Sequence, residues 1–277
     1  MMVRSRCFAF IFIGITTLLA SGAWADGLDT FKDQSGVLKI AGGTAHIPVI
    51  KEAAERIMTL NPSIQISLAG GGSGAGIKQV GEGLIDIGNS GRKATDTEMA
   101  TYGLKDYKWA IDGVAVIVNP SNGVKSLTRA QVADIYAGKI TSWKELGGED
   151  RAINIYTRDE SSGTREVFWG KALEKGTISA SAQFVVSNGA MKSAVAQDPH
   201  AIGYMSAGFV DSSVSPVTLD GVPPTAENIK NGTYPVARGL YSNTKGEATG
   251  LAKLLIDYLM SEEGQNLVAD KGFIPVR

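Results

Sequence analysis

The sequence contains one cysteine, Cys7, and two histidines, His46 and His200, in 277 residues. Cys7 is the one cysteine of the sequence and lies in an N-terminal apolar segment. The rest of the chain therefore has neither a thiol nor a disulfide. These absences exclude thiol catalysis and cysteine ligation, and they disfavour a histidine-built metal site, so no metal or cofactor is expected. A formal net charge of -1 also excludes a broad basic surface for nucleic acid. A protein of this kind that binds an anion would need a local site.

The long apolar run of the chain is confined to its N-terminus. Arg4 and Arg6 precede a run from Cys7 to Leu19, and Ala23-Trp24-Ala25 follows as a small-x-small cleavage site. A membrane span needs about 20 apolar residues, and this run is shorter. The alternative to a cleaved signal is an uncleaved membrane anchor. We predict a signal peptide over residues 1–25, cleaved after Ala25, and a periplasmic mature protein.

Strand and helix patterns alternate along the remaining chain, which predicts an α/β architecture. Strands are expected at Val37–Ala41, Ile64–Leu68, Leu84–Ile87, Val114–Val118, Ile153–Tyr156, Phe184–Val186 and Ala201–Met205. Helices are expected at Pro48–Thr59, Ile77–Glu82, Arg129–Tyr136, after Ser162, and at Gly189–Gln197, Gly250–Met260 and Glu263–Asp270. No repeat or low-complexity linker separates these elements. We therefore expect two compact lobes that exchange strands rather than two beads on a string.

Three segments share one design, in which a strand is followed by small or hydroxylated residues and then by a helix. They are Gly42–His46, Gly70–Gly76 and Ser161–Thr164. Such turns leave backbone N–H groups free at a helix N-terminus, where the helix dipole favours an anion. Ordinary helix capping is the alternative for each segment taken alone. Their recurrence favours an anion-binding site.

Arg158 lies four residues before Ser162, in the run Arg-Asp-Glu-Ser-Ser-Gly-Thr-Arg. Arginine is always charged and can give an oxyanion two parallel hydrogen bonds. The alternative is a surface arginine paired with Asp159 or Glu160. Spacing alone does not decide between the two.

These segments, in this order, resemble the phosphate-binding proteins of ABC transporters, over nearly the whole chain after the signal. Single motifs are weak, but the ordered series is specific. It runs through Gly43-Thr44-Ala45-His46-Ile47-Pro48, Gly71-Gly72-Ser73-Gly74-Ala75-Gly76-Ile77, Asp86-Ile87-Gly88-Asn89-Ser90, Asp112–Pro120, Leu127–Trp143, Arg158 with Ser162-Gly163-Thr164, and Ala201-Ile202-Gly203-Tyr204.

The resemblance implies a type II-like, two-lobed periplasmic-binding fold with a ligand cleft between the lobes. It implies lobe 1 over residues 26–117 and 215–277 and lobe 2 over residues 118–214. The implied function is an extracytoplasmic receptor, expected as a monomer, that delivers inorganic phosphate to the transmembrane permease of an ABC importer. The implied phosphate-binding residues are Thr44, Ala45, Ser73, Ser90, Gly91, Arg92, Arg158, Ser162, Gly163 and Thr164.

One position departs from part of this family. Some members carry a carboxylate that accepts a proton from phosphate and repels sulfate, where this sequence has Gly91, followed by Arg92. Arg92 either adds positive charge to the site or is a surface residue. We expect another acceptor for the phosphate proton, either a backbone carbonyl or Asp159 or Glu160. A receptor for another tetrahedral oxyanion such as sulfate is the alternative function.

A secreted hydrolase that uses Ser73 or Ser162 is the alternative from another class. Ser73 does not lie in a G-x-S-x-G elbow, because Ala75 occupies the final position. His46 has no recognisable triad context. Binding without turnover is the simpler interpretation, and we predict that the protein is not an enzyme.

Overall fold

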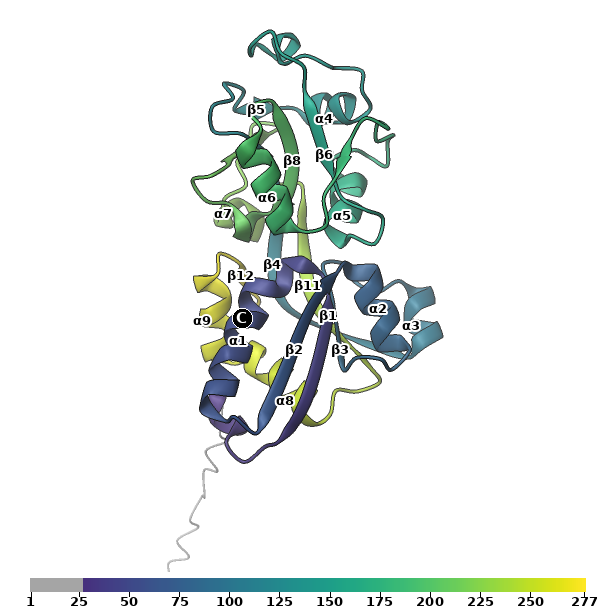
Figure 1. Ribbon diagram of the computed structural model, residues 1–277, viewed down its shortest axis with the longest axis vertical. Coiled ribbons are helices and arrows are strands. Elements are labelled where there is room, and N and C mark those ends of the chain that lie inside the picture. Colours follow the sequence, from purple (N-terminus) through teal and green to yellow (C-terminus); the bar gives the residue numbers. More distant parts are fainter. Residues whose placement is uncertain (1–26) are drawn as a thin grey trace, which may run out of the picture.

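The computed structural model describes residues 27–277, so the predicted signal peptide and its cleavage site lie outside the described residues. Two lobes are stacked along the long axis, and strands β4 (Leu104–Val118) and β11 (Ala237–Lys245) run between them (Figure 1). The two-lobed α/β fold expected from the sequence is confirmed. Within residues 27–277, no helix is both long and apolar enough to span a bilayer.

One mixed sheet passes through both lobes in the order β2-β1-β3-β11-β4-β8-β6-β7. The first part of β4, Leu104–Gly113, pairs antiparallel with β11, and its last part, Val114–Val118, pairs antiparallel with β8. Strand β4 therefore belongs to both lobes. Its burial on both faces explains the continuous apolar run that marked its second half in the sequence.

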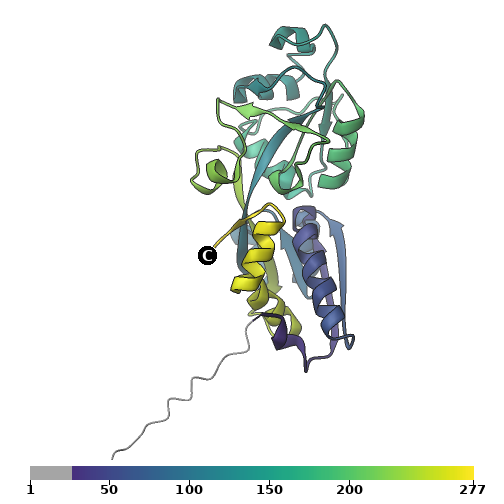
Figure 2. The ribbon, with the colours of Figure 1, turned by 90° about the vertical axis from the view of Figure 1, so that its left-hand side faces the viewer.

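The first lobe contains three parallel strands at one end of the sheet, and helices cover both faces of these strands. Strands β1 (Gly36–Gly42), β2 (Ile64–Gly71) and β3 (Ile87–Ser90) are parallel. Helices α1 (Ile47–Leu60), α8 (Gly250–Met260) and α9 (Glu262–Asp270) pack into the main core of this lobe, with α1 and α9 side by side (Figure 2). Helices α2 (Ser73–Gly81) and α3 (Asp96–Tyr102) form a smaller cluster with Leu104.

The second lobe is built on β6 (Asn154–Thr157), β7 (Gln183–Phe184) and β8 (Ala201–Ser206). Helices α4 (Arg129–Tyr136) and α5 (Gly163–Lys171) contribute to one core cluster, and α6 (Asn188–Gln197) contributes to another. Phe168 of α5 stacks on Tyr204 of β8 with ring centroids 3.9 Å apart. This contact holds α5 against the sheet.

The segment before β11 packs with the second lobe. It contains β9 (Ser215–Pro216), β10 (Thr218–Leu219), which pairs with β5 (Ser126–Leu127), and α7 (Ala226–Lys230). Leu219 and Ile229 are buried in the same cluster as Tyr136. We therefore place the return of the chain to the first lobe at β11, rather than at residue 215 as the resemblance implied. A last short strand, β12 (Ile274–Pro275), pairs with β4.

Several element predictions differ from the structure. Helix α2 begins at Ser73 instead of Ile77, because the glycine tract is its first turn. Strand β3 begins at Ile87, and residues 84–86 form bends before it. Strand β11 and the first half of β4 were not predicted. Both are crossing segments, whose polar side chains are satisfied by contacts from distant parts of the chain.

Candidate anion-binding site

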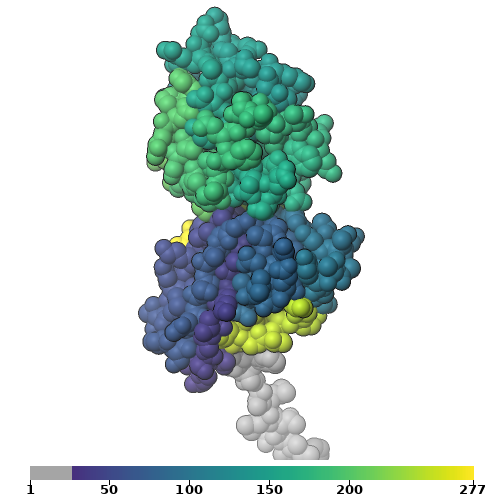
Figure 3. All heavy atoms as spheres, turned by 45° about the vertical axis from the view of Figure 1, so that its right-hand side comes forward, coloured from purple at the N-terminus to yellow at the C-terminus, as the bar shows by residue number. Residues whose placement is uncertain are grey.

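The two lobes meet closely at a narrowed junction (Figure 3). Between them lies a small cavity. Its wall is made of Gly43, Thr44, Ala45, Gly72, Ser73 and Gly91 from the first lobe, Arg158, Ser162, Gly163 and Thr164 from the second, and Arg238 from β11. The three glycine- and hydroxyl-rich turns therefore come together in one place.

Ser90 and Arg92 are the two predicted site residues that do not line this cavity. Ser90 is fully buried, and its Oγ donates to the backbone carbonyl of Arg92 at 2.6 Å. The Arg92 guanidinium points to carboxylates instead, with bonds of 2.7 and 2.8 Å to Glu98 and an ion pair of 2.5 Å to Glu166. The structure thus places Arg92 at the lobe boundary rather than in the cavity.

Helix N-termini present backbone donors to the cavity from both lobes. In the second lobe, Ser162 caps α5, and its Oγ accepts from the backbone N–H of Arg165 at 3.2 Å. Gly163 and Thr164 form the first turn of α5, where N–H groups have no carbonyl partner within the helix. In the first lobe, α2 begins at Ser73 after Gly72, whose φ of 89° is a conformation that glycine adopts without strain. Both helix dipoles favour negative charge here.

The hydroxyl groups of the cavity are arranged as donors. Ser73 Oγ accepts from the backbone N–H of Gly91 at 2.9 Å, and Thr164 Oγ1 accepts from Arg238 at 3.0 Å. Thr44 Oγ1 accepts from the side-chain amide of Asn188 at 3.1 Å. A hydroxyl whose oxygen already accepts an N–H has its own proton free to donate. The wall is therefore complementary to a group that only accepts hydrogen bonds, as the oxygen atoms of an oxyanion do.

Arg158 is the main unpaired cation of the cavity. Its side chain is 1% exposed, and its Nη2 donates to the carbonyl of Val186 at 3.0 Å. Among the described residues, its Nε and Nη1 have no hydrogen-bond partner, and burial lowers the pKa of the guanidinium below its ordinary value. An unpaired buried charge is costly, so these two donors call for an anionic partner.

The alternative partners considered for Arg158 are engaged elsewhere. Asp159 accepts from the backbone N–H of Ser161 at 2.9 Å, and Glu160 lies 3.7 Å from Arg165 with its side chain 91% exposed. Neither carboxylate lines the cavity. Arg158 is therefore not a surface arginine, and the suggestion that Asp159 or Glu160 accepts the phosphate proton is not supported by the geometry.

Arg238 is a second cavity arginine that sequence reasoning missed. Its Nε and Nη2 donate to one carboxylate oxygen of Asp112 at 2.9 and 2.7 Å, and both side chains are almost fully buried. Ser206 Oγ donates to the other oxygen of Asp112 at 2.9 Å. Asp112 thus balances the charge of Arg238 and fixes its orientation. No local motif marks Arg238, because only the pairing of β11 with β4 brings it to the cavity.

His46 supports the cavity from behind, and among the described residues its ring makes no hydrogen bond with a serine hydroxyl. Its ring nitrogens lie 3.0 Å from the carbonyl of Gly43 and 3.1 Å from that of Ser90. Burial, with a further contribution from the positive charge of Arg238, lowers the pKa of His46 to about 3. The ring is therefore neutral near pH 7, can donate to one of these two carbonyls, and packs between two turns of the first lobe.

Direct contacts close the lobes over the cavity. The backbone N–H of Gly74 donates to the carbonyl of Ser161 at 3.0 Å, and Ser161 Oγ donates to the carbonyl of Gly71 at 2.9 Å. The backbone and side-chain N–H groups of Asn188 reach Thr44 from the second lobe. The structure is that of the closed conformation, in which a ligand would be surrounded by both lobes.

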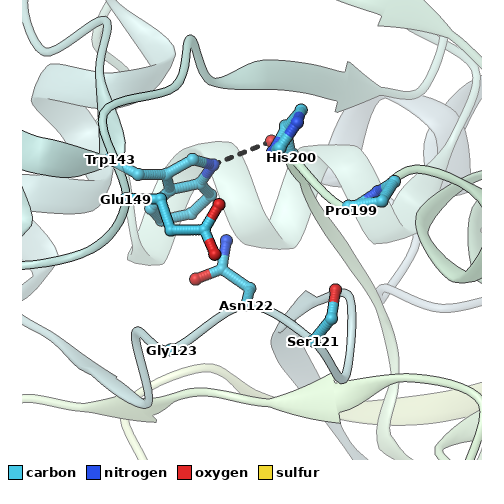
Figure 4. A pocket seen from close by; sticks show the side chains of 7 residues that line it. All are labelled: Ser121, Asn122, Gly123, Trp143, Glu149, Pro199 and His200. Atoms are coloured by element: carbon cyan, nitrogen blue, oxygen red, sulfur yellow. Dashed lines mark hydrogen bonds between the residues drawn. The ribbon is translucent and has the colours of Figure 1, made fainter.

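A larger cavity of about 370 Å³ lies within the second lobe, away from the junction. Figure 4 shows the Glu149 carboxylate beside Trp143 and Asn122, and Trp143 donates to the carbonyl of His200 at 2.9 Å. The described wall of this cavity has no arginine or lysine. A carboxylate without a neighbouring cation repels anions, so the junction between the lobes is the better candidate site.

Comparisons with known proteins agree with this architecture. Residues 25–263 match the model of the PBP superfamily domain. The phosphate-binding protein PstS of Bacillus subtilis is 43% identical over 245 residues, which cover 87% of this chain and 81% of that protein. A Clostridium perfringens protein, whose crystal structure contains bound phosphate, is 40% identical with a TM-score of 0.82, covering 87% of this chain and all of that one. An ABC-type phosphate transport receptor of Vibrio cholerae is 33% identical with a TM-score of 0.70, covering 86% and 99%.

The match over most of the chain places this protein in the PBP superfamily. Within that superfamily, the identity with the Bacillus subtilis protein shows that the chain belongs to the family of PstS phosphate-binding proteins. The resemblance identified from the ordered motifs is thereby confirmed.

Proposed function

We propose that this protein captures inorganic phosphate outside the cytoplasmic membrane and presents it to the permease of an ABC importer. The observation that carries the proposal is the cavity between the lobes, where Arg158 has two buried N–H groups without a partner. Hydroxyl and helix N-terminal donors surround it, and no carboxylate lines the wall. The names of the relatives support phosphate as the anion.

We propose that Thr44, Ala45, Ser73 and Gly91 contact the anion from the first lobe. From the second lobe the anion is contacted by Arg158, Ser162, Gly163 and Thr164. Arg238 contacts it from strand β11, which runs between the lobes. Lobe closure removes water from these contacts and strengthens each hydrogen bond. The closed shape is then what the permease recognises.

Binding without turnover is the activity we propose for this site. Ser73 and Ser162 each accept a backbone N–H, and the ring of His46 faces carbonyls rather than either serine. The relatives are named as binding proteins. Incubation with p-nitrophenyl phosphate should release no p-nitrophenolate above the rate of a buffer control, and enzyme-dependent release would contradict the proposal.

Mass spectrometry of anions released by denaturation, from protein purified without added phosphate, tests the identity of the ligand. Competition binding at pH 7 then tests selectivity. We expect phosphate to bind at least roughly a hundredfold more tightly than sulfate, a difference of about 2.7 kcal/mol. With no carboxylate in the wall, the acceptor for the phosphate proton would be a backbone carbonyl. Comparable affinities would indicate a general receptor for tetrahedral oxyanions.

A monomer that docks on a permease is the assembly we propose. Light scattering of the purified protein should give the mass of one chain. Phosphate uptake by membranes that contain the cognate permease should require the added receptor.

A further inference from the structure

Arg92 makes an ion pair that spans the two lobes. It follows β3 in the first lobe, and its Nε lies 2.5 Å from Oε2 of Glu166, which belongs to α5 in the second lobe. The Arg92 side chain is 14% exposed and that of Glu166 is 48% exposed. Because the partners come from different lobes, this contact exists only when the lobes are close together.

Contacts within the first lobe hold the Arg92 guanidinium in the orientation in which it meets Glu166. Glu98 of α3 accepts from Nη1 and Nη2 of Arg92 through its two carboxylate oxygens, at 2.7 and 2.8 Å. Glu98 is itself fixed by a capping box with Thr95, in which each residue bonds the backbone N–H of the other. This two-pronged contact restrains the guanidinium, so little side-chain freedom remains to be lost when Glu166 arrives.

Both ends of the ion pair adjoin the anion-binding turns. Arg92 directly follows Gly91, whose N–H bonds Ser73 in the cavity wall. Glu166 lies on the first turn of α5, two residues after Thr164. Among residues 27–277, Glu166 forms an ion pair with Arg92 and with no other cation. Closing the ion pair therefore brings the N-terminus of α5 against the first lobe.

We propose that Arg92 and Glu166 are positioning residues that latch the closed state and set the rate at which the bound anion leaves. The inference rests on the proposed function. An interaction made in the closed state but not in the open state shifts the equilibrium toward closure. It slows opening, and hence release, while leaving the first encounter with the anion nearly unchanged. The latch does this without touching the ligand.

Stopped-flow measurement of inorganic phosphate binding to the full-length mature protein tests the latch. Arg92→Gln and Glu166→Gln should each raise the dissociation rate roughly threefold to tenfold, because a partly exposed ion pair has a modest strength. The association rate should change by less than about twofold. The double variant should release phosphate no faster than either single variant, because one shared contact is lost in all three.

Arg129→Gln is the matched control, because Arg129 pairs with Asp220 at 2.6 Å within the second lobe and does not span the junction. It should leave the dissociation rate unchanged. Arg92→Lys should restore part of the slow release, which a merely structural defect would not. Unchanged release in Glu166→Gln, or additive effects in the double variant, would overturn the latch.

Fluorescence transfer between dyes on Lys51→Cys in the first lobe and Lys144→Cys in the second measures closure directly. Both side chains are about two thirds exposed. The closed fraction should be lower in Glu166→Gln than in the parent at any phosphate concentration that leaves both partly closed, and an equal fraction would contradict the latch. Failure of the parent protein to bind phosphate would instead contradict the proposed function. In that case the dye measurement is repeated with the anion that does close the lobes, and it still tests the latch.

Discussion

Gly163 of the second lobe lies against Ser73 of the first, so closely that a Cβ at position 163 would be 2.1 Å from Ser73 Oγ. Gly163 needs no special backbone conformation, since its φ is not in the left-handed region. The requirement for glycine here is thus a requirement of lobe closure rather than of the helix. On the opposite side, a Cβ on Gly72 would meet Ser161 Oγ at 2.5 Å, but there the φ of 89° also calls for glycine.

Gly163→Ala should therefore weaken phosphate binding at least tenfold while leaving the fold intact, because an added methyl group blocks closure across the junction and alanine favours the helix. Calorimetry gives the affinity, and small-angle scattering gives the radius of gyration. In the parent protein the radius should fall when phosphate binds, and in the variant it should fall less. Gly170→Ala is the control, because a Cβ there meets nothing within 4 Å. Equal affinities in the two variants would refute the closure argument.

Arg158→Met should weaken phosphate binding roughly tenfold to a hundredfold, because it removes charge-assisted hydrogen bonds of about 1.5–3 kcal/mol. The ligand-free protein should keep or gain stability, since the variant removes a buried charge with two unpaired N–H groups. Calorimetry and urea unfolding without phosphate check the two parts. An unchanged dissociation constant in the folded variant would remove Arg158 from the site.

Arg238 and Asp112 should behave as a coupled pair. Asp112→Asn or Arg238→Gln alone should lower the free energy of unfolding by about 3–5 kcal/mol, because each leaves a buried charge without its partner. The double variant should recover much of this stability, because neither charge remains. It should not recover phosphate affinity, since the second cavity cation is gone. Urea unfolding and calorimetry separate the two effects, and full binding by a stable double variant would exclude Arg238 as a ligand.

The low pKa of His46 should make the free energy of unfolding depend on pH. Its pKa is about 3 in the fold against an ordinary value of 6.5, so below pH 6.5 the unfolded chain binds the extra proton and the folded chain does not. The contribution of His46 to the free energy of unfolding should thus be fully present above pH 6.5. It should decline by up to about 1.4 kcal/mol per pH unit down to about pH 3. Urea unfolding between pH 7 and pH 5 measures the slope, which should be smaller in His46→Gln. The same substitution at His200 is the control, and an identical slope in His46→Gln and the parent would contradict the assignment.

Local sequence determined most of the regular structure and much of the cavity wall. Apolar periodicity marked α1, α4, α6 and α8 within about two residues, because an amphipathic face must be buried wherever the helix packs. The strand–turn–helix segments marked the turns at Thr44, Ser73 and Ser162. Their donors follow from backbone chemistry at a helix N-terminus, which does not depend on distant residues.

Tertiary structure decided which arginine besides Arg158 enters the cavity. Arg92 adjoins a cavity residue in sequence, yet Glu98 and Glu166 draw its guanidinium away to the lobe boundary. Arg238 lies 80 residues after Arg158 and carries no motif, yet the pairing of β11 with β4 sets it beside Asp112 and the cavity. The direction of a long charged side chain is set by the partners that the fold brings within reach. Those partners come from other elements and other lobes, so spacing along the chain does not contain them.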